Sequence, residues 1–84
     1  AMASAHAAYG PGRPIQIEVA TRDAAAAGRV LSRFTGEARV EFARGSAWFM
    51  IPNPSGWTRE DHPFAWRLLP ALKAAGIAVR SAVL

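Results

Sequence analysis

The sequence has no cysteine among its 84 residues. It can therefore form no disulfide, and it offers neither a thiol nucleophile nor a cysteine ligand for a metal. Acidic residues are scarce, with 6 Asp and Glu against 10 Lys and Arg, and the net charge of +4 favours acidic partners only mildly. No uninterrupted apolar run approaches the roughly 20 residues of a membrane span. Because 51% of the residues are nonetheless hydrophobic, we expect one soluble, globular domain located in the cytoplasm.

Motifs for catalysis and metal binding are also missing. The sequence contains neither a phosphate-binding glycine loop nor a Gly-x-Ser-x-Gly nucleophile motif, and it has no pair of histidines at metal-ligand spacing. The only local cluster of titratable side chains is Glu60, Asp61 and His62. Three consecutive residues of a helix point in different directions, and acidic residues in a first helical turn are explained by the helix dipole. We therefore predict a protein that is not an enzyme and that uses no metal or cofactor.

The N-terminal stretch differs in composition from the rest of the chain. Residues 1–13 are mostly small and are interrupted by glycine and proline, and the opening Ala-Met-Ala resembles the remnant of a removed purification tag. We predict a flexible arm over residues 1–13 and a single domain over residues 14–84.

The clearest structural signal is a β-hairpin within Glu37–Pro54 that turns at Arg44 and Gly45. Side chains alternate across a strand, so the hairpin has one wholly apolar face. The apolar face consists of Val40, Phe42, Ala47, Phe49 and Ile51, and the opposite face carries Arg39, Glu41, Trp48 and Met50. A slip of one residue would place charged side chains in the core, so this register is well specified.

Two helices and two further strands surround the hairpin. Alternation predicts a strand at Ile15–Ala20, and apolar residues at helical spacing predict a helix from Thr21 to Gly36. A second helix is expected within Thr58–Ala75, either kinked at Pro70 or divided there into two short helices, with Trp57 and Trp66 packed around it. A last strand follows Gly76. The order β-α-β-β-α-β predicts an α+β, ferredoxin-like sandwich, whose four-stranded antiparallel sheet has the order 4-1-3-2 with both helices on one face.

In that architecture one face of the sheet is left uncovered by helices. It displays a tryptophan and a methionine among charges of both signs: Gln16, Glu18, Arg39, Glu41, Trp48, Met50 and Arg80. Aromatic residues, methionine and arginine are enriched at protein interfaces. The favoured hypothesis is a small non-enzymatic binding or regulatory module that contacts a protein partner, or a second copy of itself, through this face around Trp48.

Single-stranded RNA or DNA is the alternative partner. A base could stack on Trp48 while Arg39, Arg44 and Arg80 contact phosphates. The segment Arg44–Ile51, RGSAWFMI, resembles the third-strand octapeptide of the RNA-recognition motif, in which Arg44, Gly45 and Ala47 match and Trp48 replaces one stacking aromatic. Two other stacking positions of that motif are held by Ser46 and Gln16 in this chain.

A third hypothesis assigns no function to the exposed face. Trp48 could be covered by Tyr9 or Pro11 of the N-terminal arm, or by the rest of a longer parent protein, because single exposed hydrophobic residues are common on protein surfaces.

Overall fold

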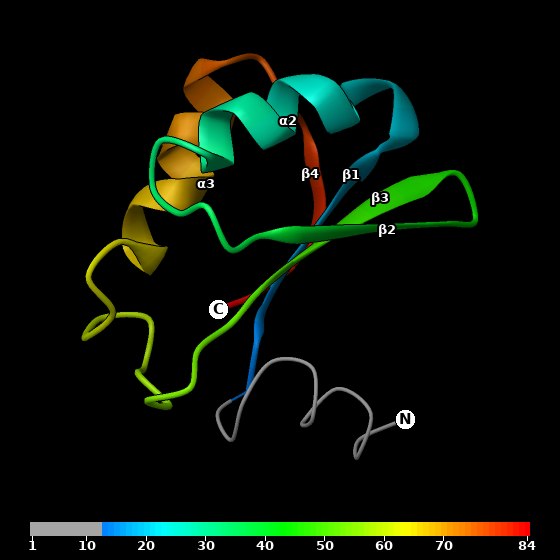
Figure 1. Cartoon of the computed structure of the whole chain (residues 1–84). Helices are drawn as coiled ribbons and strands as arrows, with labels where there is room; N and C mark the ends of the chain where they lie inside the picture. Colours follow the sequence, from blue (N-terminus) through cyan, green and yellow to red (C-terminus); the bar gives the residue numbers. More distant parts are fainter. Residues whose placement is uncertain (1–12) are drawn as a thin grey trace.

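The computed structural model describes residues 13–84 (Figure 1). The arm predicted over residues 1–13, with Tyr9 and Pro11, lies outside the described residues apart from Arg13. The elements are the strands and helices β1 (Ile15–Ala20), α2 (Ala24–Leu31), β2 (Arg39–Ala43), β3 (Ser46–Ile51), α3 (Ala65–Ala74) and β4 (Val79–Val83), with a short 3-10 turn at Thr21–Asp23. In this part of the chain no helix has the length and apolar character needed to cross a bilayer.

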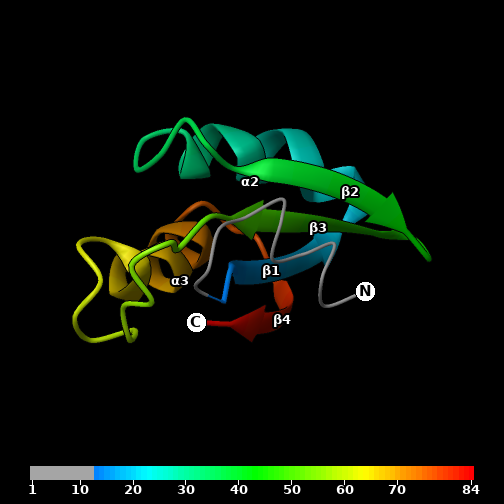
Figure 2. The ribbon, with the colours of Figure 1, turned by 60° about the horizontal axis from the view of Figure 1, so that its bottom comes forward.

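The four strands form one antiparallel sheet in the order β2-β3-β1-β4 (Figure 2). Counted from the β4 edge, the same order reads 4-1-3-2. Both helices lie over the same side of the sheet, as Figure 1 shows. The structure is therefore an α+β sandwich of one helical layer on one sheet, and the other side of the sheet has no helix over it among the described residues.

The hairpin has the register that alternation predicts. Val40 is opposite Phe49 and Glu41 is opposite Trp48, and the two-residue turn joins Ala43 to Ser46. Arg44 and Gly45 both have positive φ, 55° and 75°. Positive φ at both positions is the conformation of turns whose twist matches that of paired strands.

The hydrophobic core lies between the helices and the two central strands. Alternate residues of β1 and β3 meet one stripe of each helix, and the buried cluster contains Ile15, Ile17, Val19, Ala27, Val30, Leu31, Ala47, Phe49, Ile51, Ala65, Leu68, Leu72 and Ile77. The first helix is shorter than predicted at both ends. Thr21 caps no helix with its side chain, because it begins the 3-10 turn and its backbone N–H donates to the carbonyl of Gly45 at 3.2 Å.

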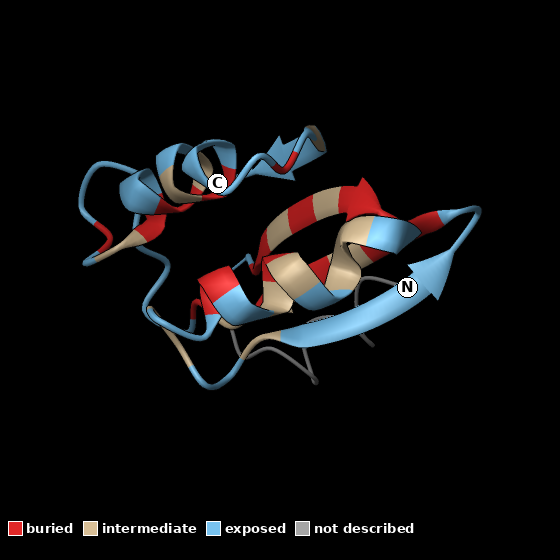
Figure 3. Cartoon of the chain, turned by 90° about the horizontal axis from the view of Figure 1, so that it is seen from above, coloured by how far each residue is buried: buried red, intermediate tan, exposed pale blue. Residues whose placement is uncertain are grey.

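The predicted burial of two large side chains is wrong. Val40 and Phe42 lie on the helix side of β2, opposite Phe49 and Ala47, but are 42% and 61% exposed. Figure 3 shows the reason, since α2 covers the central strands and leaves β2 exposed along its whole length. Trp57 and Trp66, which were expected to pack around the second helix, are each 48% exposed, and Trp66 lies beside the guanidinium of Arg67.

Helix α3 lies within the predicted segment Thr58–Ala75. Thr58 and Asp61 form a hydrogen-bonded turn, in which the Asp61 N–H donates to Thr58 Oγ1, but the helix starts only at Ala65. Pro70 lies within one continuous helix and does not divide it into two. The helix ends at Ala74 and is followed by Gly76, whose φ is 77°, and Ile77 N–H donates back to the Leu72 carbonyl at 3.0 Å, as in a Schellman motif.

Candidate functional site

Trp48 occupies the centre of the uncovered sheet face. It lies on β3, directly between Glu18 of β1 and Glu41 of β2. Met50, two residues along β3, lies between Gln16 and Arg39 in the same way. Trp48 and Met50 are both partly buried. The pairing therefore builds a row of two apolar side chains, with polar and charged side chains on either side.

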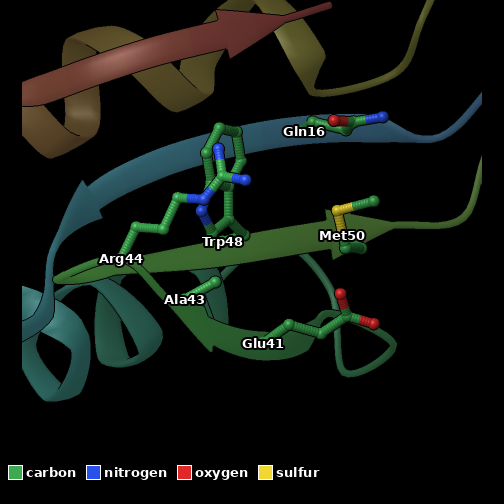
Figure 4. Close-up of a pocket in the computed structure, with 6 residues that line it drawn as sticks. All are labelled: Gln16, Glu41, Ala43, Arg44, Trp48 and Met50. Atoms are coloured by element: carbon green, nitrogen blue, oxygen red, sulfur yellow. The ribbon is translucent and has the colours of Figure 1, made fainter.

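These residues surround a shallow hollow of about 350 Å³ in the sheet face (Figure 4). Its lining comes from three neighbouring strands and the hairpin turn: Gln16, Glu41, Ala43, Arg44, Trp48 and Met50. A hollow open to solvent and floored by an indole and a thioether fits a protruding side chain of a partner better than an enclosed small molecule.

The hairpin turn brings Arg44 to this hollow. In Figure 4 the Arg44 side chain turns back from the turn toward Trp48, on the same side of the sheet. Its positive φ of 55° is uncommon for a residue with a side chain. The left-handed backbone conformation thus places a positive charge beside the aromatic centre.

Glu18 and Arg80 belong to a separate hydrogen-bond network at one end of this face. The Ser46 hydroxyl donates to Glu18 Oε2, and Arg80 Nη1 donates to Ser46 Oγ at 2.8 Å and to the Gly45 carbonyl at 3.1 Å. Ser46 is only 2% exposed. The network connects β4, β1 and the start of β3, and it fixes the Arg80 side chain against its own chain.

The structure therefore separates the site residues predicted from the sequence into two groups. Gln16, Glu41, Trp48 and Met50 meet in the hollow with Arg44, whereas Glu18 and Arg80 meet around Ser46. Arg39 is exposed on the same face beside Met50. Sequence reasoning missed the role of Ser46, although its alternation with Trp48 and Met50 places it on this face.

The cluster Glu60, Asp61 and His62 forms no metal site. No group of three potential metal ligands is present within residues 13–84. His62 is 6% exposed, and its Nδ1 accepts hydrogen bonds from the backbone N–H groups of Phe64 and Ala65, both at 3.2 Å. Burial lowers the pKa of His62 below its ordinary value of 6.5. His62 therefore acts as a neutral acceptor at the start of α3.

Comparisons with known proteins reveal no relatives. No protein-family model matches the chain, and no curated protein or solved structure shows significant similarity to it. Function must therefore be argued from the geometry of the site itself.

Proposed function

We propose that this chain is a ferredoxin-like domain that acts as a non-enzymatic protein-binding module. The element order β-α-β-β-α-β and the position of both helices on one side of the sheet support the ferredoxin-like assignment. The binding surface is the open sheet face around Trp48. The observation that carries the proposal is the hollow lined by the partly buried side chains of Trp48 and Met50 between charges of both signs.

The composition of the hollow defines the partner's chemistry. Burial of Trp48 and Met50 would supply most of the binding free energy, because aromatic side chains dominate interface energetics. Glu41 on one rim and Arg44 on the other require a partner with a basic and an acidic group around an apolar side chain. Gln16 adds an uncharged hydrogen-bonding group. A protein segment can combine all of these.

The proposal is tested by site-specific photo-crosslinking. A photoreactive amino acid is introduced in place of Met50, which lines the hollow. The same amino acid in place of Lys73 on α3, on the other side of the domain, is the matched control. We expect a protein adduct from the Met50 position that disappears in Trp48→Ala, since loss of a central tryptophan costs about 2 kcal/mol or more of binding. Equal labelling from both positions, or labelling that is insensitive to Trp48→Ala, would refute a partner site in the hollow.

Single-stranded nucleic acid is the second candidate, favoured by the position of Arg44 beside Trp48 in the hollow. Two features weigh against it. Trp48 lies directly between two carboxylates, Glu18 and Glu41, which repel phosphates. Ser46, which occupies the second stacking position of the RNA-recognition octapeptide, is buried and bonded to Glu18.

An amide and indole NMR titration with short RNA and DNA pools separates the two candidates. Nucleic-acid binding predicts shifts centred on the Trp48 indole and Arg44 that weaken steeply with added salt. Protein binding by the hollow predicts no such shifts with either pool.

A further inference from the structure

The two edges of the sheet are built differently. At the β4 edge the pairing with β1 shifts register between Glu18 and Val19, and this irregularity lies next to Arg80. A bulge at an edge strand discourages pairing with another strand. The β2 edge pairs with β3 without any such shift and contains no proline, and all five of its residues are exposed. An exposed, regular edge strand is a template for an additional strand.

The turn geometry determines which backbone groups of β2 face outward. In a hairpin closed by a two-residue turn, the residues that flank the turn form a hydrogen-bonded pair, and such pairs alternate along the ladder. Ala43, Glu41 and Arg39 therefore direct their N–H and C=O groups toward β3. Val40 and Phe42 direct theirs away from β3, where no strand follows in the described part of the chain.

We propose that two copies of this chain associate by antiparallel pairing of their β2 strands, with the two-fold axis at Val40. In this register the outward backbone groups of Val40 bond to those of Val40 of the partner subunit. Arg39 then lies directly opposite Glu41 of the partner subunit, and the symmetry repeats this pair on the other side of the axis. Both pairs fall at non-hydrogen-bonded positions, where opposing side chains are closest.

Charge complementarity selects this register. The backbone would equally allow an axis at Glu41, which would set two carboxylates directly against each other, and like charges at opposite positions are destabilising. The Val40 axis instead gives two attractive pairs. A guanidinium has five N–H donors, so Arg39 can meet the carboxylate of the partner subunit in addition to interactions within its own chain.

The apolar side chains of β2 support the same arrangement. Val40 and Phe42, 42% and 61% exposed, lie on the helix side of the strand. With the axis at Val40, the two Val40 side chains meet, and each Phe42 lies opposite Ala38 of the partner subunit. Exposed apolar area on the helix side is thus buried by the same register that pairs the charges.

The inference goes beyond the proposed function and does not depend on it. Pairing at β2 joins two four-stranded sheets into one eight-stranded sheet, with both open faces on the same side. The hollow opens on the sheet face, and Gln16, Trp48 and Met50 of its lining lie on the central strands, so these side chains stay accessible in each copy while Glu41 of β2 pairs across the axis. A dimer would present two such hollows to a partner.

A charge exchange across the axis tests the register. Sedimentation equilibrium of the full chain, at concentrations up to about 1 mM, measures the dissociation constant of the dimer. We expect Glu41→Arg and Arg39→Glu each to raise the dissociation constant about tenfold or more, and the double variant to restore it, since the exchange rebuilds both pairs. With an axis at Glu41, neither single exchange would have this effect, because Arg39 would then face Ala43 of the partner subunit.

A second pair of variants tests the backbone contact. Val40→Pro removes the outward N–H without removing a bond to β3, so we expect a folded monomer, whereas Val40→Thr keeps the N–H and stays dimeric. A mixed sample of labelled and unlabelled chains should give a contact between the Hα of Arg39 and the Hα of Glu41 of the partner subunit. A wild-type chain that remains monomeric, or a dimer that survives the β2 variants and is lost in Trp48→Ala, would overturn the proposal.

Discussion

Arg80 and Ser46, 34 residues apart in sequence, are joined by a hydrogen bond of 2.8 Å from the guanidinium to the hydroxyl oxygen. The bond spans β1, because β4 and β3 are its two neighbours in the sheet. An arginine that the sequence assigns to partner binding is thus committed to the stability of its own domain.

The first prediction concerns this bond. Arg80→Ala leaves the buried Ser46 hydroxyl without its donor and should lower the free energy of unfolding by about 1 kcal/mol. The neighbouring Ser81→Ala is the control and should change it by less than about 0.5 kcal/mol. Urea denaturation measures both, and equal stabilities for the two variants would show that the network contributes nothing.

The second prediction concerns pH. Burial lowers the pKa of His62 in the folded state, so the unfolded chain binds its proton first as the pH falls. The stability gained from neutral His62 is complete above the ordinary value of 6.5 and is lost as the pH falls from there through the lowered pKa of the folded state.

His62→Gln is the matched variant for this effect. We expect urea denaturation between about pH 7.5 and pH 5 to show a smaller loss of stability in the variant than in the wild type. Protonation of Nδ1 would also remove the acceptor of two backbone N–H groups at the start of α3. Identical pH profiles would mean that His62 titrates alike in both states.

The third prediction concerns the hairpin turn. Arg44 has a φ of 55°, which costs a residue with an ordinary side chain about 1 kcal/mol. Arg44→Asn should raise the free energy of unfolding by about that amount, since Asn-Gly is the preferred pair for this turn. Arg44→Ala removes the same charge and keeps the strain, so thermal denaturation should show no gain for it. A gain in both variants would point to charge instead of backbone conformation.

The fourth prediction concerns a glycine within α2. A Cβ at Gly28 would lie 3.8 Å from the Phe49 ring, an ordinary van der Waals contact. The space therefore admits alanine, and Gly28→Ala should stabilise the domain by about 1 kcal/mol. Gly45→Ala is the contrasting variant, because its φ of 75° makes any side chain there destabilising. A loss of stability in Gly28→Ala would contradict the packing geometry.

Local periodicity determined the faces of β1 and of the hairpin. Alternation in β1 and β3 specifies which side chains share a face, and a one-residue slip would bury charges, so the hairpin register and the composition of the open face follow from the sequence. The positive φ of Gly45 and the end of α3 before Gly76 follow from the freedom of glycine in the left-handed region.

Packing between elements distant in sequence decides which of those faces is covered. Alternation places Phe42 on the helix side, but its exposure depends on where α2 lies, and that position is set by contacts between elements distant in sequence. The same holds for Ser46, which is polar yet buried because Arg80 and Glu18 converge on it. Periodicity determines the side of a strand on which a side chain lies, whereas packing between elements determines whether that side chain is buried.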